Sequence, residues 1–209
     1  MSVTKASMRR RCLELLRNQP EHNRVYNNHS LNKKLLAEIG SSGAKEILFF
    51  YPLESEPDVR SSIMTLRRTR KLYLPFMEGV SFKMVPFRLP LKRNTFGIYE
   101  AGNTLRNIKK IDLAIVPAVG VDAQARRIGF GKGMYDRFFA GLKKRPKIIF
   151  VQSKHCYTDK RICDGYDISA DLLLTPHAVF GRARIKNVKR NALGRRCRYD
   201  QRGNRLFYL

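Results

Sequence analysis

The chain has 209 residues, of which 43% are hydrophobic, and this length and composition favour one globular domain with a substantial core. No apolar run approaches the ~20 residues needed to cross a membrane, and the N-terminus lacks the apolar region of a signal peptide, so we expect a cytoplasmic protein. The 42 Lys and Arg outnumber the 17 Asp and Glu, and the net charge of +25 favours anionic partners such as nucleic acids or polyanionic substrates.

Helical and strand-like segments alternate along the chain. A first helix is predicted over residues 4–18, with Thr4 as its N-cap and with Lys5 and Arg9 one turn apart. Further helices are expected at residues 30–39, at residues 59–70 and after residue 133. Strands are expected at residues 46–51, 71–76, 81–87, 113–116, 147–151 and 172–174. This alternation is typical of an α/β fold, so we predict a single three-layer domain with a largely parallel central sheet flanked by helices.

The C-terminal segment differs in composition from the rest of the chain. Residues 181–209 hold ten Lys and Arg and one Asp, and apolar residues are sparse there before the last four. We therefore predict a domain over residues 1–180 and a basic extension over residues 181–209. Two interpretations of the extension remain: a disordered segment whose end docks on the domain, which we favour, or an arm that contacts RNA.

A glycine-rich loop follows the apolar strand at residues 113–116. Gly129, Gly131 and Gly133 allow positive φ and a close approach of the backbone to a ligand, and Arg127 and Lys132 add positive charge. The start of the helix that follows would favour an anion as well. The spacing matches neither a Walker A loop nor a dinucleotide fingerprint, and tight turns also contain glycines. The loop therefore indicates phosphate binding without identifying the ligand.

A longer motif surrounds this loop. Residues 116–137 read V-P-x-V-x-x-D-x-x-x-x-R-I-G-F-G-K-G-M-Y-D-R, which resembles the signature of the 5-formyltetrahydrofolate cyclo-ligase (methenyltetrahydrofolate synthetase) family. Further matches follow in the family's order, and the resemblance covers roughly residues 5–176. Two positions depart from the family's pattern. Ala125 stands where Gly is usual, and Ala101 follows Glu100 where the family commonly has Pro. The further matches are Lys5-x-x-x-Arg9, Glu56 after Tyr51, and Asp167 ahead of Thr175-Pro176.

The resemblance implies conversion of 5-formyltetrahydrofolate to 5,10-methenyltetrahydrofolate with ATP as co-substrate and Mg²⁺ as cofactor. It implies catalytic roles for Lys132 and Arg127, and Mg²⁺ ligation by Asp136 and Asp167, since Mg²⁺ takes one or two carboxylates beside phosphate oxygens. ATP contacts would come from Lys5, Arg9, Arg127, Ile128, Gly129, Phe130, Gly131, Lys132, Gly133, Met134 and Tyr135. Substrate contacts would come from Tyr51, Glu56, Tyr99, Phe130, Gly131, Lys132, Gly133 and Met134.

Two other interpretations are open. One is a basic RNA-binding protein with a degenerate nucleotide loop, which the net charge supports, although the aromatic residues form no evident stacking platform. The other is a folate-binding homologue that has lost catalysis. The preferred interpretation is an enzyme that acts on small molecules without membrane partners, and the sequence leaves its oligomeric state open.

Several aromatic and sulfur-containing residues have less specific interpretations. Phe96 and Tyr99 can stack on a planar ligand or pack in the core, and His155 is expected in an exposed loop without a catalytic role. The four cysteines, which have no C-x-x-C spacing, are predicted to be free thiols rather than zinc ligands or a disulfide framework. They are Cys12, Cys156, Cys163 and Cys197.

Overall fold

The computed structural model describes residues 3–18, 20–95, 97–106, 108 and 110–186. The helices are α1 (Lys5–Arg17), α2 (Glu21–Ser42), α3 (Arg60–Leu66), α4 (Met134–Ala140) and α5 (Arg182–Lys186). The strands are β1 (Glu46–Leu48), β2 (Lys71–Glu78), β3 (Ser81–Pro86), β4 (Lys92–Arg93), β5 (Tyr99–Glu100), β6 (Leu113–Pro117), β7 (Gly120–Val121), β8 (Arg127–Ile128), β9 (Lys147–Val151), β10 (Leu172–Leu174) and β11 (Val179–Gly181).

The described part of the chain forms one seven-stranded sheet with the order β11-β10-β9-β6-β1-β2-β3. The four central pairs, from β10–β9 to β1–β2, are parallel, and the edge strands β3 and β11 are antiparallel to their neighbours. Two short ribbons, β4–β5 and β7–β8, lie outside this sheet. The predicted α/β fold with a largely parallel central sheet is confirmed.

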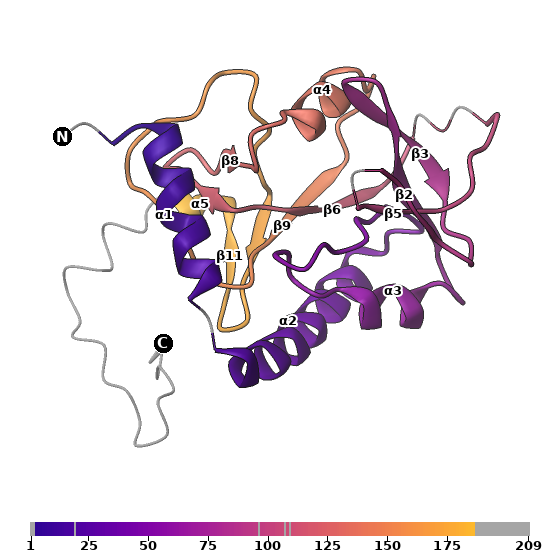
Figure 1. Cartoon of the computed structure of the whole chain (residues 1–209), viewed down its shortest axis with the longest axis horizontal. Coiled ribbons are helices and arrows are strands. Elements are labelled where there is room, and N and C mark those ends of the chain that lie inside the picture. Colours follow the sequence, from indigo (N-terminus) through magenta and orange to yellow (C-terminus); the bar gives the residue numbers. More distant parts are fainter. Residues whose placement is uncertain (1–2, 19, 96, 107, 109, 187–209) are drawn as a thin grey trace.

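Helices cover both faces of the sheet, because successive side chains of a strand point to opposite faces. Ile47 on β1 packs with the apolar residues of α2 and α3, whereas the next residue, Leu48, packs with the aromatic side chains of α4. Both side chains are fully buried. In Figure 1, α2 and α3 accordingly lie on one side of the sheet and α4 on the other, which confirms the three-layer prediction.

Helix α1 packs outside these two clusters. Its Met8 and Cys12 are buried against Val119, which precedes β7, and against Ile128 of β8. Cys12 forms a disulfide with Cys156 across a sequence separation of 144 residues. The prediction that these cysteines are free thiols was therefore wrong, since a pairing over such a separation depends on the tertiary fold and not on local spacing.

The helix boundaries differ from the predicted ones in two places. Helix α2 begins at Glu21 rather than at residue 30. The prediction missed its first turns because they expose Val25 and Tyr26 to solvent and so lack the apolar stripe that indicates a helix. The helix ends at Gly43, which takes a left-handed φ of 65° as a C-cap. Helix α3 spans seven residues instead of the predicted twelve.

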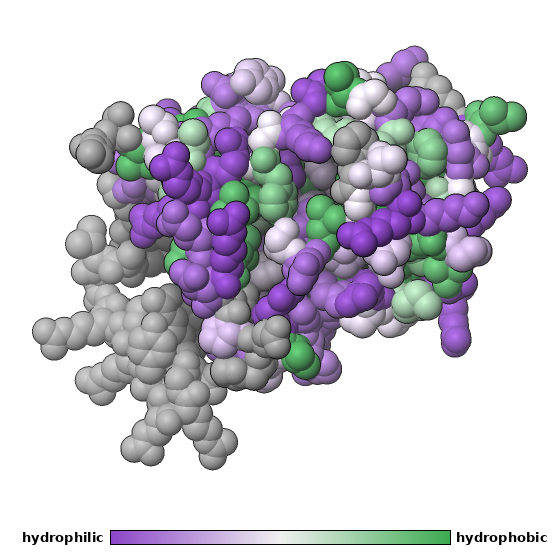
Figure 2. Space-filling view, viewed as in Figure 1, coloured by the Kyte–Doolittle hydropathy of each residue, from purple (hydrophilic) through white to green (hydrophobic). Residues whose placement is uncertain are grey.

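Beyond β10 the chain forms β11 and α5, which the sequence did not indicate. Ile185 of α5 is buried in the same cluster as Leu48, so the packed structure continues past residue 180. The proposed extension from residue 181 stays a prediction, because residues 187–209, including Cys197, lie outside the described residues, as does Phe96. Figure 2 shows hydrophilic side chains over α1, whose Arg10, Arg11 and Arg17 are exposed.

Candidate active site

The candidate site lies where the strand order changes direction. The chain runs from β1 through α3 to β2 on one side, whereas β6 pairs with β1 on the other. In open α/β sheets, ligands bind at the carboxyl ends of the strands at such a point. The loop at residues 49–59 follows β1 there, and the segment at residues 118–133 follows β6. The predicted site residues of these two segments are thus brought to one edge of the sheet.

Helix α1 supplies two cations to this edge. Thr4 and Ser7 cap its first turn through reciprocal hydrogen bonds, as predicted for Thr4. The Lys5 ammonium donates to Asp167 Oδ2 at 2.5 Å, and Arg9 Nε donates to the carbonyl oxygen of Gly129 at 2.7 Å. Burial lowers the pKa of Lys5, but the hydrogen bond and charge of Asp167 outweigh it, so the pKa is raised overall. Lys5 therefore stays protonated.

The glycine loop has the backbone geometry that its glycines allow. Gly131 and Gly133 take φ of 112° and 60°, which side chains with a Cβ rarely adopt. Gly129 has another role: a Cβ at this position would collide with the Arg127 guanidinium. The loop therefore needs glycine twice for its path and once for the space that Arg127 fills.

Arg127 is almost completely buried behind this loop. Its Nε donates to the carbonyl oxygen of Pro117 at 2.8 Å, and its guanidinium lies 4.8 Å from the ring centroid of Tyr135. Burial lowers its pKa, while the Tyr135 ring and the carboxylates of Asp136 and Glu56 act in the opposite direction. An arginine stays charged under physiological conditions, so this is a fixed buried cation near carboxylates.

Two carboxylates face Arg127 across the site. Asp136 Oδ1 accepts a hydrogen bond from the backbone N–H of Ile168 at 3.0 Å, and Asp167 Oδ2 accepts from Lys5 and from the N–H of Asp164. Among the residues that the structure describes, the second oxygen of each carboxylate accepts no hydrogen bond, and no group of three or more His, Cys, Asp or Glu could hold a metal ion. A pair of oxygens with this freedom fits Mg²⁺, which keeps water and phosphate as its other ligands.

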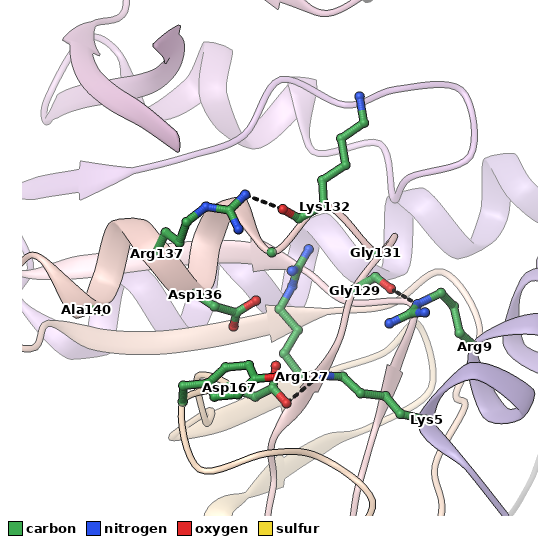
Figure 3. Close-up of a pocket in the computed structure, with 12 residues that line it drawn as sticks. Lys5, Arg9, Arg127, Gly129, Gly131, Lys132, Asp136, Arg137, Ala140 and Asp167 are labelled. Atoms are coloured by element: carbon green, nitrogen blue, oxygen red, sulfur yellow. Dashed lines mark hydrogen bonds and ion pairs between the residues drawn. The ribbon is translucent and has the colours of Figure 1, made fainter. Parts of the chain in front are cut away.

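These groups line one cavity of about 490 Å³, within the range of small-molecule sites. Figure 3 shows Lys5, Arg9, Arg127, Asp136 and Asp167 gathered around it, while the Lys132 side chain extends away from the two carboxylates. Among the described residues, five cations and two carboxylates line the cavity, so it favours a polyanion. Its full lining is Lys5, Arg9, Arg127, Gly129, Gly131, Lys132, Gly133, Asp136, Arg137, Ala140, Tyr166 and Asp167.

The predicted folate contacts are divided: Gly131, Lys132 and Gly133 line the larger cavity, whereas Glu56 and Phe130 do not. Glu56 and Phe130 line a second, narrow cavity of about 10 Å³, and Tyr51 packs against Tyr99 with 5.5 Å between ring centroids. Glu56 Oε2 accepts from the N–H of Leu53 at 3.0 Å. Burial raises the pKa of the Glu56 carboxyl to about 7, although this hydrogen bond and the charge of Arg127 lower it in part.

Three side chains predicted from the motif point elsewhere. Ile128 is fully buried against α1, and Met134 and Tyr135 pack against the sheet with α4. Their backbone atoms remain within the loop and its first helical turn, so these residues can reach a ligand through the main chain. Their predicted roles as ligand contacts stay predictions.

Sequence reasoning missed three residues that line the larger cavity. Arg137 lies four residues after Gly133 on α4, so helical spacing could have found it; its guanidinium donates to the carbonyl oxygens of Lys132 and Val80. Ala140 follows on the same helix. Tyr166 comes from an irregular loop, where spacing gives no side-chain direction.

Asp122, the acid of the signature, is fully buried and supports the site from behind. Its Oδ1 accepts from the N–H groups of Gln124 and Arg126 at 2.8 and 2.9 Å, and its Oδ2 accepts from Cys163 at 3.2 Å. It thus joins the turn before β8 to the segment that leads to Asp167. The same turn holds Ala125 at φ 61°, a conformation that suits the glycine usual in the family.

Comparisons with known proteins agree with the motif. The chain is 27% identical to 5-formyltetrahydrofolate cyclo-ligase of Haemophilus influenzae over 117 residues, which are 52% of this chain and 63% of that protein, just under two thirds of its length. It is 25% identical to the protein of the same name from Mycoplasma pneumoniae over 146 residues, which are 69% and 81% of the two chains.

Two solved structures share the fold. The NMR structure of Aquifex aeolicus 5,10-methenyltetrahydrofolate synthetase matches with a TM-score of 0.74 at 23% identity, covering 94% of this chain and 97% of that one. The Mycoplasma pneumoniae synthetase matches with a TM-score of 0.64 at 20% identity, covering 83% and 99%. The sequence pattern of the 5-formyltetrahydrofolate cyclo-ligase family matches residues 1–156, and the chain belongs to this family.

Proposed function

We propose that the protein converts 5-formyltetrahydrofolate and ATP to 5,10-methenyltetrahydrofolate, ADP and phosphate. The observation that carries this proposal is that one loop borders two unlike cavities. Gly129, Gly131, Lys132 and Gly133 line the cationic cavity, and Phe130 lines the narrow one beside Glu56. A phosphate donor and a folate bound on the two sides of this loop would meet across it. Membership of the family supports the same activity.

The formyl oxygen of the substrate is a poor leaving group until it is phosphorylated. The formyl oxygen attacks the γ-phosphorus of ATP, the bond from that phosphorus to the bridging oxygen of ADP breaks, and the formyl carbon becomes electrophilic. N10 then attacks this carbon and gives up its proton to solvent, and the bond from the carbon to the former formyl oxygen breaks, so that this oxygen departs with the transferred phosphate. Phosphoryl transfer needs mainly positioning and charge stabilisation, which fixed cations provide.

The residues divide these tasks. Lys5 and Arg9 would hold the phosphates from α1, while Arg127, buried and stacked on Tyr135, would stabilise the charge that develops on the transferred group. Lys132 would contact the same group from the loop. Arg127 is well suited because its pre-set orientation costs no reorganisation during the reaction.

Asp136 and Asp167 would hold Mg²⁺ through the oxygens that accept no hydrogen bond from described residues. When bound, Mg²⁺ would neutralise charge on the ATP phosphates. The ion pair with Lys5 would keep Asp167 in place for this role.

On the folate side, Glu56 would accept hydrogen bonds from pterin N–H groups, and Tyr51 and Tyr99 would pack on the folate. The Phe130 side chain would help to hold the folate so that its formyl group reaches the γ-phosphate. No helix in the described ranges combines the length and apolar character required for a bilayer span. We propose a cytoplasmic enzyme with small-molecule substrates.

The test is the growth of methenyl-folate absorbance with purified protein, 5-formyltetrahydrofolate, Mg²⁺ and ATP. We expect growth that requires both ATP and Mg²⁺, and we expect Lys132→Ala and Asp136→Asn to lower the rate at least 100-fold with the fold unchanged. Folded protein that binds folate without turnover would instead identify a catalytically silent homologue. Protein that binds neither ligand but binds RNA, with an affinity that falls steeply with salt, would support the nucleic-acid alternative.

A further inference from the structure

The larger cavity is charged over most of its lining, and this leaves one part of a nucleotide without an obvious partner. The cations and carboxylates account for phosphates and a metal ion, but a nucleobase is planar and uncharged. Of the described residues that line the cavity, Tyr166 is the one aromatic, and Ala140 is the one with a small apolar side chain. A base bound in this cavity could stack on the aromatic ring of Tyr166.

Tyr166 is both exposed and held in place. About 72% of its surface is accessible, so much of the ring is open to a ligand. Its hydroxyl donates to Asp164 Oδ2 at 2.9 Å, and the Asp164 N–H in turn donates to Asp167 Oδ2. The ring is therefore fixed relative to the proposed metal carboxylate.

The position of the ring relative to the phosphate cations also fits a nucleotide. Lys5 Nζ lies over one face of the Tyr166 ring, 5.7 Å from its centroid, and 2.5 Å from Asp167 Oδ2, so one ammonium joins the ring to the phosphate end of the cavity and leaves the opposite face for a base. A base on this ring would remain within reach of its own phosphates. Stacking on this ring would also cost little side-chain entropy, because Tyr has only two χ angles and the hydrogen bond to Asp164 already orders them.

We propose that Tyr166 is the platform on which the purine base of the nucleotide stacks. This proposal rests on the proposed function, since it concerns the nucleotide of the same site. Tyr166 then determines how tightly the nucleoside part binds, while Lys5, Arg9 and Arg127 bind the phosphates. The two contributions are separable, because inorganic pyrophosphate with Mg²⁺ presents the phosphates without a base.

The experiment compares Mg-ADP with Mg-pyrophosphate binding by calorimetry in the full chain, for wild type, Tyr166→Ala and Tyr166→Phe. We expect Tyr166→Ala to weaken ADP binding about tenfold, a typical loss for one stacked base, and to leave pyrophosphate binding unchanged. Tyr166→Phe keeps the ring and removes the hydrogen bond to Asp164, so its ADP affinity should stay within about twofold of wild type. In steady state, Tyr166→Ala should raise the KM for ATP with kcat and the folate KM unchanged.

Each other outcome counts against the platform. If pyrophosphate binding falls as much as ADP binding, Tyr166 supports the Asp164–Asp167 segment and does not contact a base. If Tyr166→Phe loses as much ADP affinity as Tyr166→Ala, the hydroxyl carries the effect and the ring does not. Unchanged ADP binding in Tyr166→Ala overturns the platform alone, whereas wild-type protein that binds neither probe overturns the proposed function with it.

Discussion

The two cavities that share the glycine loop differ in how they are kept open. The larger cavity holds about 490 Å³ and is lined mainly by charged groups and glycine backbone, whereas the narrow cavity beside Glu56 holds about 10 Å³ and is lined largely by apolar side chains and proline. The charged side chains of the larger cavity are held by polar contacts, as Arg9 is by the carbonyl oxygen of Gly129. Apolar walls instead gain free energy by closing on each other when no ligand is present.

This difference indicates that the two substrates meet different conditions. The larger cavity, the proposed phosphate side, is preorganised by polar contacts between distant segments, such as those of Lys5 with Asp167 and of Asp122 with Cys163. If the narrow cavity takes the folate, as proposed, it has to widen around Phe130 and the loop that holds Glu56, because its volume is about 10 Å³. We therefore expect ATP to bind a largely preorganised site, and part of the free energy of folate binding to be used in opening the narrow cavity.

The largest effect on the larger cavity is expected from the Gly129→Ala variant. The added Cβ would collide with the Arg127 guanidinium and displace the buried cation from its place beside Tyr135. A displacement of about 1 Å in a catalytic group can cost about 100-fold in rate, so we expect at least that loss in kcat. Turnover and folate binding are measured together, and folate binding should change little.

Gly102→Ala is the matched control for this variant. A Cβ at Gly102 meets no atom within 4 Å, and its φ is not positive, so turnover and stability should stay near wild type. Wild-type kcat in Gly129→Ala would contradict the assigned role of Arg127, because the guanidinium could then leave its position at no cost to the reaction.

A second test concerns the tether that holds α1 against the larger cavity. The Cys12–Cys156 disulfide joins the helix carrying Lys5 and Arg9 to the segment after β9. Its removal in the Cys12→Ala/Cys156→Ala variant should lower the free energy of unfolding by about 2–5 kcal/mol and raise the KM for ATP more than that for folate. Urea denaturation and steady-state kinetics measure the two effects.

Reduction of the wild-type protein should reproduce this variant, and thiol counting by mass spectrometry verifies the redox state. Cys163→Ser serves as the control, because Cys163 forms no disulfide with the described residues. Equal increases in both KM values would show that the tether supports the whole fold rather than the ATP side.

The sequence predicted the sheet well because the strands that form it are continuous apolar runs. Residues 147–151 and 172–174 were predicted with the bounds that the structure has, and the predicted strand at residues 113–116 extends by one residue in β6. The first half of α2 was missed because its exposed apolar residues follow no period, and the strand β11 because three half-buried residues give too short a pattern.

The site was predicted unevenly for a physical reason. Lys5, Arg9 and the loop glycines were found because helical spacing and the motif order specify their positions, and the structure does gather them around one cavity. Tyr166 and the Cys12–Cys156 pair were missed because both depend on how distant segments fold together. Ala125, which stands where glycine is usual in the family, takes a positive φ in its buried turn.

The smallest effects are expected at the narrow cavity, from the titration of Glu56. Its pKa is raised to about 7, so the folded protein binds a proton that the unfolded chain releases near pH 4.5. Stability should therefore fall as pH rises from about 4.5 to 7, by up to about 3 kcal/mol at about 1.4 kcal/mol per pKa unit, and level off above. Thermal denaturation across this range measures the slope, which Glu56→Gln should abolish.

Folate binding should show the opposite trend, because the ionised carboxylate accepts hydrogen bonds from pterin N–H groups and the protonated form does so poorly. We expect the folate KM to rise up to tenfold per pH unit below pH 7 in the wild type and to be high and pH-independent in Glu56→Gln. The exposed neighbour Glu54, changed to Gln, is the control and should leave both profiles unchanged. A Glu56→Gln variant that is less stable than wild type at pH 8 would mean that the carboxylate supports the folate side, not that it is held there at a cost for binding.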